Sequence, residues 1–155
     1  MATWSEFEAA NPEMAARGRS LFYQFGIGLG FMATIRADGG PRLHPFCPIV
    51  AEGGVFGFII DSPKRRDLLR DGRVAIHACG GDEVDDEFYF TGNARRIDDP
   101  STIEKVLAAY RASGGDDDGH ALLFEFDIER AMLATYEKRP SWPPVYTKWA
   151  APEVD

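Results

Sequence analysis

Three strand-like runs separated by tight turns occupy residues 29–60 and limit what the chain can fold into. The first, residues 29–36, alternates with a period of two, and the third, residues 55–60, is almost continuously apolar; both patterns are typical of β-strands. The second, residues 42–50, contains two prolines and is therefore expected at a sheet edge or with a bulge. Because such short turns join antiparallel neighbours, the runs predict an antiparallel sheet.

The rest of the chain adds further strands and a few helices. We expect helices over residues 5–25 and 62–71, and a third that starts at a capping box formed by Ser101 and Glu104. Further strands are predicted at residues 73–78, 87–97 and 121–136, the last of them a strand or a bent pair. The pattern indicates a mainly β (α+β) protein with an antiparallel six-stranded barrel, closed or half-closed, and a few peripheral helices.

The predicted elements divide the chain into three parts. The boundaries are residues 1–28 for an N-terminal helical segment, 29–137 for the barrel, and 138–155 for a C-terminal tail whose Pro-rich start, residues 140–144, is unsuited to regular structure. A chain of 155 residues fits one domain.

Charge and composition exclude several classes of partner. The net charge of −8 argues against duplex nucleic acid and against anionic membranes. The first residues lack the basic, apolar pattern of a signal peptide, and no run approaches the ~18 apolar residues that cross a bilayer. Two cysteines are too few for a disulfide framework. We therefore expect a cytoplasmic protein with reduced thiols.

A basic cluster follows the third strand directly. Ser62 is suited to the N-cap of a helix and Pro63 to its first position, which places Lys64, Arg65 and Arg66 in the first turn. Cations are unfavourable there, because a helix N-terminus is already partly positive. A bound phosphate would offset this charge. The alternative is a solvated helix face whose counter-charges are supplied by nearby residues, namely Asp61, Asp67 and Asp71.

The cluster and its surroundings resemble a known family. A strand, Ser-x-Lys at residues 62–64 and a short helix resemble the phosphate-binding turn of the pyridoxamine 5′-phosphate oxidase-like FMN-binding split barrels. Residues 33–39, 71–76 and 90–97 resemble that family's first strand and turn, the strand after its short helix, and its strand with a central Gly-x-Ala. The likeness extends from Leu29 to Ile128 and implies a split barrel, a homodimer and an FMN at the dimer interface.

The resemblance also implies roles for single residues. Ser62 and Lys64 match phosphate ligands, Arg36 matches a basic position near the flavin ring or ribityl chain, and Glu87 matches a polar group supplied by the second subunit. The cofactor-binding residues implied in this way are Arg36, Ile60, Asp61, Ser62, Lys64, Arg65 and Glu87. Phe31 stands where the family's oxidases have Arg, and the C-terminal residues have no counterpart of their substrate-binding groups. Oxidation of pyridoxamine phosphate is therefore not implied.

Other groups of residues point less clearly to chemistry. His44 with Cys47, and His77 with Cys79, suggest zinc, but paired C-x-x-C motifs are absent and we expect no metal. His44 is instead a candidate catalytic residue that donates a proton or hydrogen bond to the flavin ring. The acidic run at residues 82–87 is expected to be a solvated loop. Three aromatic residues of the tail are expected either to pack on the barrel or to cover the flavin, namely Trp142, Tyr146 and Trp149.

These observations favour an FMN-dependent oxidoreductase that acts on a small-molecule substrate, in which the flavin carries the redox chemistry. One alternative is a reductase of the same fold that uses the deazaflavin F420, which also has a phosphate and a ribityl chain. A second is a non-enzymatic flavin- or haem-binding protein of stress or storage. A third is a barrel without cofactor that serves as an interaction module.

Overall fold

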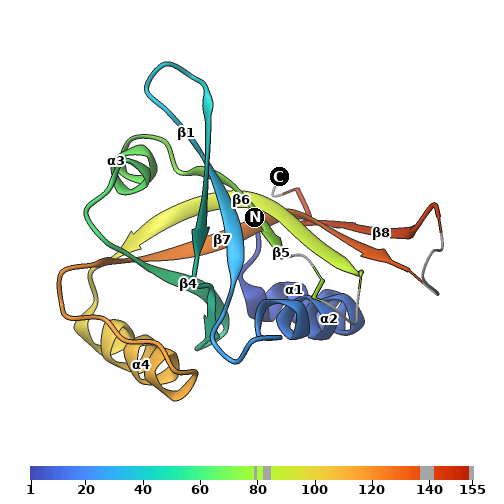
Figure 1. The fold of residues 1–155 in the computed structure, drawn as a ribbon, viewed down its shortest axis with the longest axis horizontal. Helices are drawn as coiled ribbons and strands as arrows, with labels where there is room; N and C mark the ends of the chain where they lie inside the picture. Colours follow the sequence, from blue (N-terminus) through green and yellow to red (C-terminus); the bar gives the residue numbers. More distant parts are fainter. Residues whose placement is uncertain (79, 82–84, 137–141, 154–155) are drawn as a thin grey trace.

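An eight-stranded antiparallel sheet forms the centre of the molecule in the computed structural model, which describes residues 1–78, 80–81, 85–136 and 142–153 (Figure 1). The elements, in chain order, are α1 (Trp4–Ala10), α2 (Pro12–Phe22), β1 (Gly30–Ile35), β2 (Pro41–Phe46), β3 (Ile49–Ala51), β4 (Gly54–Ile59), α3 (Pro63–Arg70), β5 (Arg73–Ala78), β6 (Glu87–Ile97), α4 (Pro100–Ala112), β7 (Leu122–Thr135) and β8 (Val145–Ala150). The mainly β, α+β architecture predicted from the sequence is confirmed.

The strand order is β2-β1-β5-β6-β7-β4-β3, and β8 pairs with β7 beyond the end of β4. The long strand β7 has two partners along one edge, since its residues 122–125 pair with β4 and its residues 130–135 pair with β8. The ring of Phe46, at the end of β2, packs edge-on against Phe126 of β7 with 5.7 Å between centroids. This contact brings one edge of the sheet back toward its middle, which gives the half-closed barrel.

Several boundaries differ from those predicted. The N-terminal helix is two helices, because Asn11 ends α1 and caps α2, whose first residue is Pro12. The predicted strand at residues 42–50 is divided into β2 and β3 around Pro48. The α4 helix is capped by Asp99, whose carboxylate accepts from the Thr102 amide at 2.8 Å, so the predicted capping box is wrong. Two strands exceed the predicted six: β3, and β8 within the predicted tail.

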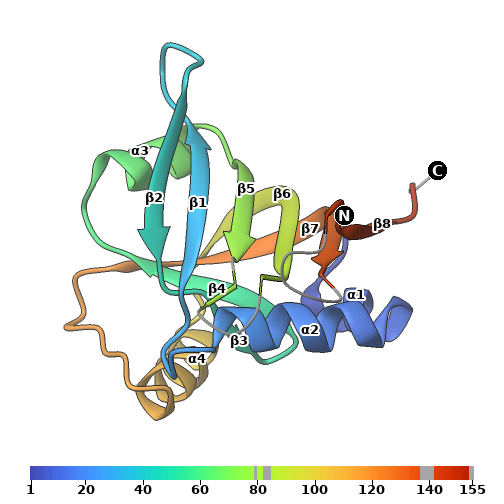
Figure 2. The ribbon, with the colours of Figure 1, turned by 45° about the vertical axis from the view of Figure 1, so that its right-hand side comes forward.

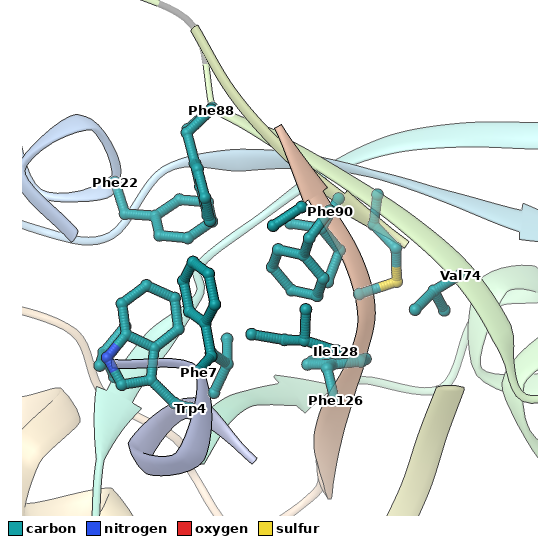
Figure 3. Close-up of a cluster of buried hydrophobic side chains, with 14 of the residues drawn as sticks. Trp4, Phe7, Phe22, Val74, Phe88, Phe90, Phe126 and Ile128 are labelled. Atoms are coloured by element: carbon teal, nitrogen blue, oxygen red, sulfur yellow. The ribbon is translucent and has the colours of Figure 1, made fainter. Parts of the chain in front are cut away.

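The main core lies on one face of the sheet, under α1 and α2 (Figure 3). Aromatic rings from the helices meet rings from the sheet, as Phe22 of α2 meets Phe88 of β6 at 5.8 Å between centroids. Trp149 of β8 joins this cluster through Phe7 at 4.9 Å. A smaller core lies between α4 and the β3–β4 edge, around Val106 and Phe56. No helix in the described ranges combines the length and hydropathy needed to cross a membrane.

The opposite face of the sheet is apolar in part and open to solvent. Residues that stand directly opposite each other across β2, β1, β5, β6 and β7 form a row on this face, namely Pro45, Phe31, His77, Tyr89 and Met132. Leu43, in the next row, is 67% exposed. We call this surface the outer face.

Candidate functional site

The predicted phosphate-binding turn forms where β4 leads into α3, beside the β1–β2 hairpin (Figure 2). Ser62 is the N-cap, and its hydroxyl oxygen accepts from the Arg65 amide at 3.4 Å. The Arg66 amide donates to the Ser62 carbonyl at 3.2 Å, and Pro63 has no amide hydrogen. The Lys64 amide is therefore the N–H of the first turn that can donate to a ligand.

Two of the three cations of the turn are paired with Asp61. The Arg65 guanidinium lies 3.0 Å and that of Arg66 3.6 Å from the Asp61 carboxylate. Arg65 also donates to the His120 carbonyl at 3.2 Å, and its side chain is only 17% exposed. Asp61 therefore offsets the charge of both arginines locally, but only Arg66 lies on a solvated face.

Lys64 is in a different environment. Its ammonium group donates to the Pro45 carbonyl at 3.2 Å, and it forms no ion pair with any residue in the described ranges. The side chain is half-buried, and this burial lowers the pKa of Lys64, opposed in part by the nearby Cys47 thiol. Burial and the same thiol raise the pKa of Tyr110, on α4, to about 12. The turn thus contains one partly buried cation with no counter-ion among these residues.

His44 lies near Lys64, whose ammonium group donates to the carbonyl of Pro45, the residue after His44. It is on β2, opposite Met32 of β1, and its Nε2 atom is buried with no hydrogen-bond partner in the described part of the chain. The pKa of His44 is lowered by burial and by the positive charges of Lys64 and Arg42, while Asp67 opposes this shift. His44 therefore lies near the predicted phosphate-binding turn.

A buried carboxylate fixes α3 against the β1–β2 hairpin. Asp67 is 3% exposed and accepts from Thr34 Oγ1 at 2.9 Å, from Arg42 Nε at 2.7 Å and from the Arg70 guanidinium at 3.4 Å. Burial alone raises the pKa of Asp67, but the hydrogen bonds from Arg42 and Thr34 bring it below its ordinary value. The alternative in which Asp67 is a solvated counter-charge of the basic cluster therefore does not hold for this residue, which is buried and pairs with Arg42 and Arg70.

Sequence reasoning missed Arg42 and Thr34. Arg42 and His44 are two apart on one strand and share a face with Thr34, directly opposite Arg42 on β1. The two-residue spacing of Arg42 and His44, together with an acidic residue on the next helix, is the sequence pattern that could have predicted this cluster.

Arg36 and Glu87 lie away from the turn within one chain. Arg36 pairs with Asp38 at 3.0 Å at the tip of the hairpin. It follows Ile35, whose carbonyl accepts from the side chain of Arg70, the last residue of α3, whereas Ser62 caps the other end of that helix. Glu87 alternates with the buried Phe88 and faces the outer side of the sheet. Ile60 and Asp61 are exposed between β4 and α3. All these role assignments stay predictions.

The remaining candidate groups have mixed outcomes. No cluster of three or more potential metal ligands occurs in the described residues, and Cys79 lies outside them. Residues 82–84 of the acidic run also lie outside, but Asp86 is buried and accepts from Arg17 Nε at 2.9 Å, so it is not solvated. Trp149 packs on the core, whereas Trp142 is 78% exposed.

No protein-family model and no curated protein matches the sequence. Solved structures do match. A NimC/NimA family protein from Clostridium acetobutylicum is 18% identical, with 86% of this chain and 93% of that one covered at a TM-score of 0.61. The heme storage protein HutZ from Vibrio cholerae is 19% identical, with 77% and 89% covered at a TM-score of 0.58.

A heme binding protein from Mycobacterium smegmatis is 15% identical, and the match covers 87% of this chain at a TM-score of 0.65. The chain spans 57% of that protein's length. At identities of 15–19%, these likenesses show a shared fold, the split β-barrel, and leave the ligand open.

Proposed function

We propose that this chain binds FMN through the turn at Ser62 and Lys64 and serves as a flavin-dependent oxidoreductase for a small-molecule substrate. The observation that carries the proposal is the Lys64 ammonium, which is half-buried and lacks a counter-ion among the described residues while Arg65 and Arg66 share Asp61. A partly desolvated cation is stabilised by an anionic ligand, and a phosphate at a helix N-terminus also receives the free amide hydrogen.

The chain's own residues bind and orient the cofactor. Lys64 supplies a charge-assisted hydrogen bond and its amide a second donor to the phosphate. The Asp67 contacts with Thr34 and Arg42 hold α3, and therefore the turn, in a fixed position on the hairpin. When bound, FMN supplies hydride or electron transfer, and the protein sets its position and its access to water. The turn offers the same donors to the phosphate of F420.

A homodimer is part of the proposal. The outer face carries Phe31 and Leu43, both exposed in one chain, beside half-buried Tyr89 and Met132. Exposed apolar surface of this kind is typical of protein–protein contacts. Glu87 belongs to the same side of the sheet, so pairing through this face offers it to the flavin of the second copy.

Haem is the second candidate ligand, and the specific observation in its favour is the fold shared with proteins described as heme binding and heme storage. His77 fits this alternative, because it lies on the outer face next to Tyr89, with 6.5 Å between ring centroids. If haem binds at this face, the His77 imidazole would supply a nitrogen ligand to its iron.

Binding experiments with FMN, riboflavin, F420 and haemin test the proposal. We expect wild-type protein to bind FMN and show flavin absorbance, and Lys64→Ala to weaken binding roughly tenfold or more, since a hydrogen bond to a charged group contributes about 1.5–3 kcal/mol. Arg66→Ala is the matched control, because Arg66 is exposed and paired with Asp61, and should retain FMN. Riboflavin, which has no phosphate, should bind equally to both variants.

Other outcomes discriminate between the candidates. A Soret band with haemin and no flavin binding overturns the flavin proposal in favour of haem. Bound flavin that NADH, NADPH and reduced F420 all fail to reduce supports a non-enzymatic flavin protein. If neither wild type nor Lys64→Ala binds any of the four ligands, the remaining candidate is a barrel without cofactor that serves as an interaction module.

A further inference from the structure

The buried Nε2 atom of His44 is without a hydrogen-bond partner in the described part of the chain. Unpaired polar atoms in protein interiors are rare and destabilising, and they often mark a place where a ligand or proton belongs. This one lies beside the proposed phosphate turn rather than in the apolar core. The other such atom, Trp4 Nε1, lies among aromatic rings.

Charged groups from two elements surround His44. Arg42 is on its own strand, and Lys64 and Asp67 are on α3. The negative charge of Asp67 is already engaged by Thr34, Arg42 and Arg70. Beyond β2, Cys47 acts on Lys64 and, separately, on the Tyr110 hydroxyl of α4. Two cations and one engaged anion therefore act on the imidazole, and their net effect with burial keeps the pKa of His44 below its ordinary value.

From this geometry we infer that His44 is the proton-accepting member of the phosphate site: when a phosphate monoester dianion binds at Lys64, His44 takes up a proton from solvent. The inference rests on the proposed function and reassigns His44 from the flavin ring to the phosphate end. The only covalent change is the transfer of one proton to the imidazole, and no electrons move. By linkage, protonation of His44 strengthens phosphate binding by the same factor.

The sign of the effect follows from the two states of His44. In the free protein the pKa of His44 is below its ordinary value, and a dianion next to Lys64 raises it. Between those two values affinity increases as pH falls, by at most about tenfold per pH unit for one proton. The phosphate itself acts oppositely, because its second pKa is about 6 and the monoanion is the weaker ligand. His44 therefore compensates on acidification for what the phosphate loses.

Isothermal titration calorimetry of FMN in buffers of different ionisation enthalpy tests the inference in wild type and two variants. We expect wild type to take up protons near neutral pH, and His44→Gln to take up none and to lose affinity below pH 7. His120→Gln is the control, since the His120 side chain is exposed and only its carbonyl contacts Arg65. It should behave as wild type.

Each alternative result is informative. If wild type binds FMN with the same proton count and pH profile as His44→Gln, the inference is overturned and the proposed function stands. If FMN does not bind at all, the proposed function fails. The His44 ring protons of wild type, titrated by NMR with and without inorganic phosphate, then decide separately: an upward pKa shift with phosphate supports the inference and an unchanged pKa overturns it. Because the NMR titration uses wild type alone, it also tests the inference if His44→Gln does not fold.

Discussion

Removal of the Asp67 carboxylate should destabilise the fold strongly, because three donors from separate parts of the structure depend on it. Thr34 is fully buried, and without Asp67 its hydroxyl loses its acceptor, at about 1–3 kcal/mol. Breaking a buried ion pair by removing one partner costs about 3–5 kcal/mol. The side chains of Arg42 and Arg70 are 29% and 41% exposed, so water takes over part of their solvation and the lower part of that range applies. We expect Asp67→Ala to lose about 3 kcal/mol.

Urea unfolding at fixed protein concentration measures this loss, with Asp71→Ala as the control, since Asp71 forms its ion pair with an exposed Arg73. The pKa of Asp67 is lower in the folded state, so its contribution is complete above the unfolded value of about 4 and is lost as pH falls through the folded value. The difference between wild type and Asp67→Asn should therefore shrink below about pH 4. An Asp67→Ala variant within about 0.5 kcal/mol of wild type at pH 7 would refute this account of α3.

Two other predictions follow from packing. Gly92→Ala should lower the free energy of unfolding by at least about 2 kcal/mol, because a Cβ there would lie 1.7 Å from the Asp127 carbonyl oxygen at the bulge between β6 and β7. A melting temperature equal to that of wild type would contradict this prediction. Leu43→Asp should convert the dimer to a monomer, as measured by light scattering coupled to size-exclusion chromatography. Leu69→Asp is the control, because Leu69 is also exposed but lies on α3, and it should stay dimeric. Identical masses for the two variants would show that the outer face is not the dimer interface.

The sequence predicted the features whose cause is local. The Ser62 cap, Pro63 at the helix start and the end of α3 at Asp71 are set by neighbouring residues and are confirmed. The capping box at Ser101 was wrong because Asp99 offers an acceptor two residues earlier, and Pro100 suits the first helical position.

Features that depend on tertiary packing were harder to predict from the sequence. Asp67 meets Arg42 from 25 residues away, and Asp86 meets Arg17 from 69 residues away. Local composition made both carboxylates resemble solvated charges, because nothing nearby in the sequence shows which face of a helix or loop is covered. Arg65 and Arg66 raised the apparent charge of the turn, although Asp61 offsets them.

The charge that remains at the turn connects the proposed ligand with the inferred proton. Lys64 contributes one fixed positive charge, while a phosphate monoester carries about 1.5 to 2 negative charges at pH 7. The inferred proton on His44, near Lys64, would supply a second positive charge. A haem propionate carries a single charge, which Lys64 balances alone and which draws no proton onto His44. Proton uptake on binding thus separates a phosphate ligand from a carboxylate ligand at this turn, even though the shared fold accommodates both.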